Sequence, residues 1–372
     1  MMDALTGVLR LRPGQARPRS VENSRPGWAE ALVPGKPAAE VPGLLGSLFS
    51  LCGHAHRLCA QMALDAAAGG AAVPASGAAR ALQQETLREH VRRIGLDWPA
   101  ALAAPAARQP FAGAALQSLG SCPALRGPAA PLPDTRLWLE RQLLGMPAQD
   151  WLDRWTAEPD WWAAWSEAGR GWLPRLVREA RAVADWPVAA ADPLHAHAGN
   201  VSLRQLARYL AADAGYTRQP RWQDACAETG SWTRLHEAAR PLPATPWQRL
   251  GARLAELARL TLPDAPGHAG CGWLSFGALQ TADGEGLAWV EMARGLLVHH
   301  ARVDGVVSAY RVLAPTEWNF HAEGAVARAL EGLPTRPDAQ GQRRIAALMA
   351  AYDPCVRFEV ESQALEQESA HA

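Results

Sequence analysis

The sequence predicts an α+β protein that is mainly helical, in which a bundle of long helices accompanies a small antiparallel hairpin region near residues 287–313. Of the 372 residues, 48% are hydrophobic and 20% are charged, which is enough to bury a large core. Apolar residues recur at helical spacing through most of the chain, whereas the last third contains two extended β-branched runs. No repeat period interrupts this pattern, so we expect a single domain over residues 1–372.

The first third predicts a short strand, an irregular segment and two helices. Residues 7–12 form the candidate strand, and residues 12–43 are rich in proline and glycine, which favours irregular structure. Residues 44–68 are rich in alanine and leucine, which indicates a buried helix entered near Gly53. A second helix is expected over residues 78–94, ending at Gly95.

The middle of the chain is marked by tryptophans. Trp151, Trp155, Trp162 and Trp165 lie roughly on one helical face, although Pro159 must break or restart that helix. Since nothing cationic or base-binding accompanies this stripe, packing between helices is favoured over an aromatic ligand cage.

Two later helices have recognisable starts. Ser202 with Gln205 matches a capping box, followed by Leu203, Leu206, Ala207 and Leu210 on one face until Gly215. Thr245, Pro246 and Gln248 supply the N-cap, N1 and N3 residues of the next helix.

The C-terminal part changes character after Gly272. Residues 287–303 and 306–313 are extended and apolar, and Asp304 with Gly305 between them is the strongest hairpin signal in the chain. Residues 342–351 return to helix, which ends before Asp353 and Pro354. Residues 359–372 are expected to form an exposed acidic tail.

Charge and composition exclude several classes of partner. The 37 Lys and Arg residues balance 37 Asp and Glu residues, so no overall basic field recruits nucleic acid or a membrane surface. Apolar stretches are too short for a membrane span, and the N-terminus has neither a secretory nor a twin-arginine signal. We therefore expect a cytoplasmic protein whose six cysteines are thiols.

Common catalytic motifs are absent from the sequence. There is no GxGxxG, GxxxxGK[ST], HExxH or CxxC element, and Ser275 lacks the preceding glycine of a nucleophile elbow. His195 and His197 could share one face of a strand and bind a metal, but they stand in a loop-like stretch, so the unliganded interpretation is favoured.

Two short clusters are more unusual. Cys52, His54 and His56 stand at the predicted mouth of a helix, where the helix dipole and free N–H groups lower the pKa of a thiol and favour a metal-binding thiolate. A buried cysteine beside capping groups is the alternative. Asp353, Pro354 and Cys355 place a carboxylate near a thiol at a turn, which is a weak signal by itself.

With the segment before it, the C-terminal cluster resembles a known family. Residues 291–324 read EMARGLLVHHARVDGVVSAYRVLAPTEWNFHAEG, which is similar to the [NiFe]-hydrogenase large subunit pattern RGxLxH, a DG hairpin, a tyrosine-containing strand, PTxWN and later DPCxxC. The N-terminal RxCGxCxxxH element has its counterpart in SLFSLCGHAH, which aligns Cys52 and His56. The C-terminal matches are Arg294, Gly295, Leu297, His299, Asp304, Gly305, Tyr310, Pro315, Thr316, Trp318, Asn319, Asp353, Pro354 and Cys355.

Two departures decide what this resemblance implies. Phe49 and Phe358 replace one cysteine of each family pair, so Cys52 and Cys355 remain and cannot supply the four-thiolate nickel cradle. One retained cysteine from each half is the pattern of the HupK/HoxV family of hydrogenase accessory proteins. This resemblance implies a large-subunit-like fold and a non-catalytic scaffold that receives or holds the Fe(CN)2CO unit, without nickel, during hydrogenase assembly.

The resemblance also implies partners and roles for single residues. Its partners would be a HypC-type chaperone, a HypD-type assembly protein and the hydrogenase large-subunit precursor. Cys52 and Cys355 would hold the iron, with His56, Arg294 and Asp353 around them; the guanidinium fork of Arg294 could hydrogen-bond cyanide nitrogens.

Some interpretations stay open at this point. A degenerate redox enzyme with an altered iron site, or a metal-free structural subunit like the relatives in respiratory complex I, are the alternatives to an assembly scaffold. His299 and His300 alternate on their strand, so at most one should point inward. The remaining cysteines match no family ligand and are expected to be structural: Cys59, Cys122, Cys226 and Cys271.

Overall fold

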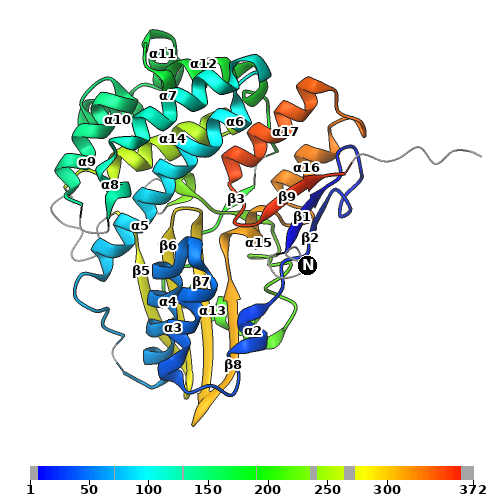
Figure 1. Cartoon of the computed structure of the whole chain (residues 1–372). Coiled ribbons are helices and arrows are strands. Elements are labelled where there is room, and N and C mark those ends of the chain that lie inside the picture. Colours follow the sequence, from blue (N-terminus) through cyan, green and yellow to red (C-terminus); the bar gives the residue numbers. More distant parts are fainter. Residues whose placement is uncertain are drawn as a thin grey trace, which may run out of the picture.

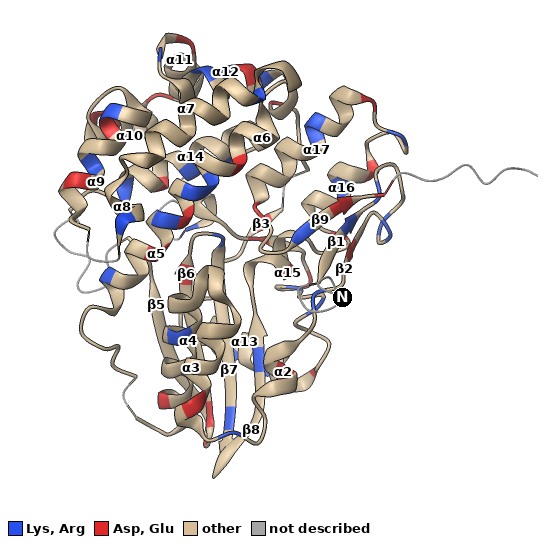
Figure 2. Ribbon diagram, in the orientation of Figure 1, with Lys and Arg blue, Asp and Glu red and all other residues tan. Residues whose placement is uncertain are grey.

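The computed structural model describes residues 7–70, 72–127, 130–189, 191–234, 241–263 and 273–361. A helical half and a half built on an antiparallel sheet lie end to end (Figure 1). Positive and negative side chains are interspersed over both halves (Figure 2), as the balanced composition predicts. Within the described ranges, no helix has the length and apolarity needed to cross a membrane.

The main sheet is antiparallel and larger than the hairpin region predicted from the sequence. Its strands are β5 (Phe276–Ala282), β6 (Glu285–Met292), β7 (Gly295–Asp304) and β8 (Val306–Leu313), in the order β5-β6-β7-β8. The hairpin across Asp304 and Gly305 is confirmed, with Gly305 in the left-handed region at φ +67°. The long run before it is two strands, which pair from Met292 with Gly295 onward and leave Arg294 in the turn.

Both faces of this sheet are covered. Helices α3 (Val41–Leu48) and α4 (Gly53–Ala67) lie across one face (Figure 1), and α4 approaches so closely that a Cβ on Gly286 would lie 2.1 Å from the carbonyl oxygen of Ala63. Helix α13 (Asn200–Ala212) packs its leucines on the other face. His299 and His300 are therefore both buried, and the expectation that at most one points inward was wrong.

The helical half is assembled around α14 (Pro246–Arg259), α12 (Trp172–Ala184) and α17 (Ala339–Tyr352). Helix α5 (Ala78–Arg92) does not stop at Gly95: it continues as a π-helical turn over Arg93–Asp97 into α6 (Trp98–Leu102), since Gly95 lets Leu119 pack against the backbone. The predicted tryptophan stripe packs between α10 (Ala148–Ala157) and α11 (Trp161–Ala168), with Trp151 and Trp165 edge to face at 5.8 Å.

The two ends of the described chain meet in a second sheet. Its order is β2 (Val21–Asn23), β1 (Val8–Leu11) and β9 (Arg357–Val360), and β9 runs parallel to β1 with Leu9 opposite Phe358. Residues 12–43 are thus not wholly irregular, and the expected acidic tail begins as a strand because β1 offers it an edge. Residues 362–372 of that tail lie outside the described part of the chain.

The two predicted helix starts had different outcomes. Thr245 caps α14 as predicted and accepts a hydrogen bond from the backbone N–H of Gln248 at 3.2 Å. Helix α13 instead begins after Gly199, so the Ser202 capping box was wrong, although its apolar face is buried as expected. The remaining elements are α2 (Trp28–Leu32), η1 (Ala38–Glu40), η2 (Ser50–Cys52), η4 (Pro105–Ala107), α7 (Arg108–Gly120), α8 (Pro123–Arg126), α9 (Leu132–Leu139), η5 (Glu140–Leu144), β3 (Asp192–Pro193), β4 (Ala227–Glu228), η6 (Ser231–Thr233), α15 (Pro315–Asn319) and α16 (Ala325–Glu331).

Candidate metal centre

Cys52 is the last residue of η2 and stands at the mouth of α4, as the sequence predicts. Its side chain is buried, and burial raises the pKa of the thiol to about 12. The expectation that the helix mouth lowers this pKa was wrong. Burial is the main reason, and Glu85 adds to it: its carboxylate accepts hydrogen bonds from the N–H groups of His54 and Ala55 at 2.8 and 2.9 Å and so occupies the helix N-terminus.

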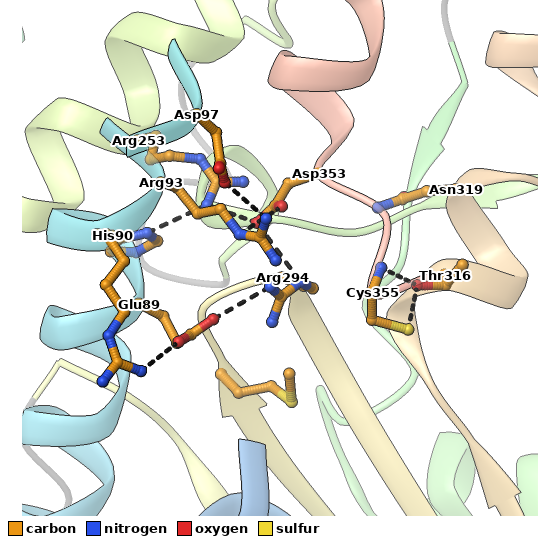
Figure 3. A network of polar contacts seen from close by, with 12 residues as sticks. Glu89, His90, Arg93, Asp97, Arg253, Arg294, Thr316, Asn319, Asp353 and Cys355 are labelled. Carbon is orange, nitrogen blue, oxygen red and sulfur yellow. Dashed lines mark hydrogen bonds and ion pairs between the residues drawn. The ribbon is translucent and has the colours of Figure 1, made fainter. Parts of the chain in front are cut away.

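Cys355 lies on the turn between α17 and β9 and is half-buried. The hydroxyl of Thr316 donates to its sulfur at 3.0 Å and accepts from its backbone N–H at 3.3 Å (Figure 3). The two cysteines interact electrostatically, since a charge on Cys355 raises the pKa of Cys52. Folding therefore brings one thiol from each end of the chain into one region.

Asp353 is fixed by three arginines just before Cys355. Its carboxylate lies 3.0 Å from Arg253, 3.0 Å from Arg93 and 3.4 Å from Arg294 (Figure 3). These guanidinium groups outweigh the effect of burial and lower the pKa of Asp353 to about 2. Asp353 also ends α17 in the left-handed conformation, at φ +50°. The turn that carries Cys355 is thus anchored by charge on its N-terminal side.

Arg294 occupies the turn between β6 and β7 and is 2% exposed. One terminal nitrogen, Nη2, donates to Glu89 at 3.1 Å. Nη1 is buried and has no hydrogen-bond partner. Both thiols act on this guanidinium, because a charge on Cys52 or Cys355 raises its pKa. Arg294 therefore presents an unused hydrogen-bond donor in the region of the two sulfurs.

Gly295 and Asn319, two residues of the family pattern, fix the turn that carries Arg294. The side chain of Asn319 makes two hydrogen bonds, each 2.8 Å, with the backbone of Thr229. The hydroxyl of Thr229 in turn accepts from the N–H of Leu296 at 2.9 Å. Gly295 has φ +129°, and a Cβ there would lie 2.5 Å from that hydroxyl, so only glycine fits. The clamp from α15 to the turn accounts for glycine and asparagine at these two positions.

His56 does not touch a charged group. Its Nδ1 lies 3.0 Å from Nε2 of His299, whose Nδ1 lies 2.8 Å from the hydroxyl of Tyr310. Burial lowers the pKa of both histidines, that of His299 to about 3, so both rings are neutral. Phe49, which replaces a family cysteine, stacks on His56 with ring centroids 4.0 Å apart. An aromatic pair thus fills the place of one thiol.

A buried charge network extends from Asp353 through the helical half, and the sequence did not reveal it. Arg253 contacts His90 at 3.2 Å, His90 contacts Glu256 at 2.7 Å, and Glu256 pairs with Arg234. Arg234 and His197 then both approach Glu291, His197 at 3.2 Å. These residues stand singly along the chain, in helices, a strand and two loops, so no local motif marks them.

The other candidates have structural roles. His197 and His195 are separated, with Nε2 of His195 at 3.0 Å from the carbonyl of Thr233, so the two do not face a common metal. Ser275 lies beside Glu291, to which its backbone N–H donates. Cys59 and Cys122 are buried, and Cys271 lies outside the described residues. Pro315 and Trp318 are buried in α15, as family-pattern residues that shape the fold.

Considering the residues that the structure describes, no group of three or more His, Cys, Asp or Glu side chains is placed to hold a metal ion. Beside Arg294, the carboxylates of Glu89 and Asp353 are engaged in ion pairs, which leaves the two thiols as candidate ligands. Two thiolates and a free guanidinium N–H suit an iron fragment that brings its own strong-field ligands, because the N–H can donate to a ligand nitrogen.

Proteins of known name resemble this chain over nearly its whole length. The chain is 42% identical over 371 residues to the hydrogenase expression/formation protein HoxV of Cupriavidus necator, covering 96% of both chains. It is 32% identical to HupK of Rhizobium leguminosarum, covering 92% of this chain and 91% of that one. No protein-family model matches the chain.

Solved structures show the same fold at low sequence identity. The [NiFeSe] hydrogenase of Desulfovibrio vulgaris Hildenborough superposes with a TM-score of 0.54 at 14% identity, over 90% of this chain and 92% of that chain. An NAD+-reducing [NiFe]-hydrogenase gives a TM-score of 0.53 at 19% identity, over 90% and 91%. The expected large-subunit-like fold is confirmed, and the chain belongs to the HupK/HoxV family of hydrogenase expression/formation proteins.

Proposed function

We propose that this protein serves in hydrogenase maturation as a non-catalytic carrier, which holds the Fe(CN)2CO unit between Cys52 and Cys355 before the unit passes to the large-subunit precursor. The observation that carries the proposal is the placement of one thiol from each end of the chain beside Arg294, whose Nη1 is buried without a partner. A buried donor of this kind is costly unless a ligand satisfies it.

The donor set fits such a cargo better than a resident metal. Two thiolates leave an iron that carries two cyanides and one carbonyl with five ligands, and the Arg294 fork can donate to a cyanide nitrogen. Among the residues that the structure describes, a bare metal ion would find two protein ligands here. The protein therefore selects a fragment that arrives already ligated.

Incomplete coordination also explains release. A finished large-subunit site offers four thiolates, whereas this chain offers two, so transfer to the precursor is downhill. Phe49 and Phe358 mark the missing positions: Phe49 is packed against His56, and Phe358 lies in β9, 37% exposed. Neither position leaves a place for nickel ligands.

This role requires partners on both sides of the transfer. A HypC-type chaperone or a HypD-type assembly protein would deliver the iron unit, and the large-subunit precursor would receive it in the cytoplasm. The protein would perform no chemistry on the cargo other than exchange of thiolate ligands.

The test is an infrared spectrum of the full chain purified without oxygen from its own host. Cyanide and carbonyl bands are expected in the wild type, and Cys52→Ser or Cys355→Ser should abolish both kinds of band and lower hydrogenase maturation in cells. Arg294→Lys should weaken the bands less, since lysine keeps the charge but loses the fork.

Cys226→Ser is the matched control, because Cys226 contacts His321 at 3.3 Å and has no part in the pair. This variant should keep wild-type bands. Wild-type protein without either kind of band would contradict the carrier, and the metal-free structural interpretation would replace it. Hydrogen uptake by iron-loaded protein would instead support a degenerate redox enzyme.

A further inference from the structure

A cavity of about 870 Å³ opens beside the candidate site. Its walls come from the β2–α2 connection, the segment after α13 and the end of β8, and they include Arg25, Phe49 and Glu317. These three residues also belong to the surroundings of the two thiols. Arg25 interacts electrostatically with Cys52 and Cys355, and Glu317 follows Thr316, the hydrogen-bond partner of Cys355.

The inner wall of this cavity is an ion pair rather than packed apolar side chains. Nη1 of Arg25 donates to Glu317 at 2.8 Å, and the guanidinium lies 5.3 Å from the centre of the Phe49 ring. The second carboxylate oxygen of Glu317 is buried and has no hydrogen-bond partner. The two side chains are 14% and 10% exposed, so the pair borders the cavity at its inner end.

The outer wall is positive. Arg218 and Arg311 line it together with Glu30, so that with the inner pair three arginines face two carboxylates. Glu30 is engaged by the N–H of Val312 at 3.2 Å. Arg311 donates to the carbonyl of Tyr310, and its Nε is buried without a partner. Among the described residues, neither Arg218 nor Arg311 forms an ion pair with a carboxylate.

We infer that this cavity is the passage by which a cyanide-bearing iron fragment, anionic while the thiolates that deliver it remain bound, reaches Cys52 and Cys355, with Arg218 and Arg311 attracting it and the Arg25–Glu317 pair lining the inner end. The inference rests on the proposed function for the identity of the cargo. A volume of this size admits a small ligated metal with its exchanging partner group, and an excess of positive charge in a cleft attracts anions.

The passage is tested without iron, so that its failure is separate from failure of the carrier. The full chain is treated with an anionic and a cationic methanethiosulfonate of similar size, and modification of Cys355 is followed by peptide mass spectrometry. The anionic reagent should react faster, by up to about tenfold at low salt. Arg218→Glu should remove this preference, while Arg170→Glu should keep it, because Arg170 is exposed between α11 and α12 and does not line the cavity.

A second variant narrows the cavity itself. Ala31 is exposed on its wall, so Ala31→Trp should slow both reagents at Cys355 and leave the fold intact, whereas Ala164→Trp, an exposed position on α11, should slow neither. Circular dichroism checks folding of both variants. Equal rates in the two tryptophan variants, or no preference for the anionic reagent in the wild type, would overturn the passage and leave the carrier proposal to the infrared test.

Discussion

The two thiols of the candidate site are held in different ways. Cys52 is 7% exposed at the start of a helix that packs on a sheet, and burial raises the pKa of its thiol to about 12. Cys355 is half-buried on a short turn between α17 and an edge strand, held by Thr316 on one side and by the charge cluster at Asp353 on the other. Cys52 is thus part of the hydrophobic core, whereas Cys355 belongs to a turn that fewer contacts hold in place.

This difference suggests an order of events for a carrier. The accessible Cys355 would meet an incoming fragment first, and the buried Cys52 would close the site by losing its proton. To test this difference, each group that holds the Cys355 turn is substituted separately, and the thiol of Cys52 is then titrated.

The largest effect is expected from Asp353→Asn, which leaves Arg253, Arg93 and Arg294 without their shared carboxylate. Breaking a buried charge cluster costs about 3–5 kcal/mol of the free energy of unfolding. Urea unfolding measures this loss. Asp97→Asn is the control, because Asp97 contacts only Arg93 among these arginines and is half-exposed, so it should cost less than about 1 kcal/mol.

The low pKa of Asp353 also predicts that the free energy of unfolding depends on pH in the acid range. Its folded pKa of about 2 lies below the ordinary value of 3.8, so Asp353 stabilises the fold above pH 3.8 and loses this effect as the pH falls through about 2. The difference between wild type and Asp353→Asn should therefore shrink over that window. A difference that is constant with pH would show that the carboxylate does not carry the cluster.

A smaller loss is expected from Gly295→Ala, in the turn that carries Arg294. Its φ of +129° and the contact of 2.5 Å with Thr229 predict a cost of about 1–3 kcal/mol. Gly305→Asn is the comparison, because Gly305 is also left-handed but faces open space and asparagine tolerates that conformation. Similar unfolding free energies for the two variants would show that the Thr229 clamp is unimportant.

Thr316→Val tests the other support of Cys355. Losing the hydroxyl removes a donor to sulfur and an acceptor for the Cys355 N–H, at a cost of about 1 kcal/mol. Alkylation by iodoacetamide should become faster at Cys355 and stay unchanged at Cys52, which serves as the internal reference. Faster alkylation at both would mean general loosening rather than release of the turn.

The smallest effect is expected from a titration of Cys52, which needs no substitution. The folded pKa of about 12 lies above the ordinary 9.0, so the neutral thiol favours folding below pH 9.0 and this contribution is lost as the pH rises towards 12. Alkylation of Cys52 should consequently keep rising with pH beyond 9. A plateau near pH 9 would contradict burial as the dominant influence.

The sequence predicted the structure best at positions where the local backbone conformation requires a particular residue type. Gly305 was found because a two-residue hairpin needs a positive φ, and Thr245 because a helix N-terminus needs an acceptor. The turn at Arg294 was missed because Gly295 is set by a contact with Thr229 rather than by a turn motif, and β5 was missed because it is only half-buried.

Long-range electrostatics was the part that the sequence could not supply. Burial, with a further contribution from Glu85, outweighs the expected effect of the α4 helix mouth on the pKa of Cys52, and Glu85 stands on another helix with no signal in common. Glu89 and Arg253 likewise reach Arg294 and Asp353 from α5 and α14. Such pairings depend on how helices pack, which local patterns do not encode.

The most direct measurement of the carrier is iron-edge X-ray absorption of the full chain purified without oxygen from its host. The account predicts two sulfur neighbours at a distance comparable to the ~2.3 Å of zinc–thiolate bonds, together with short bonds to carbon. Cys355→Ser should lower the sulfur count from two to one or remove the iron. Iron with four sulfur neighbours, or iron with none, would contradict a site built from Cys52 and Cys355.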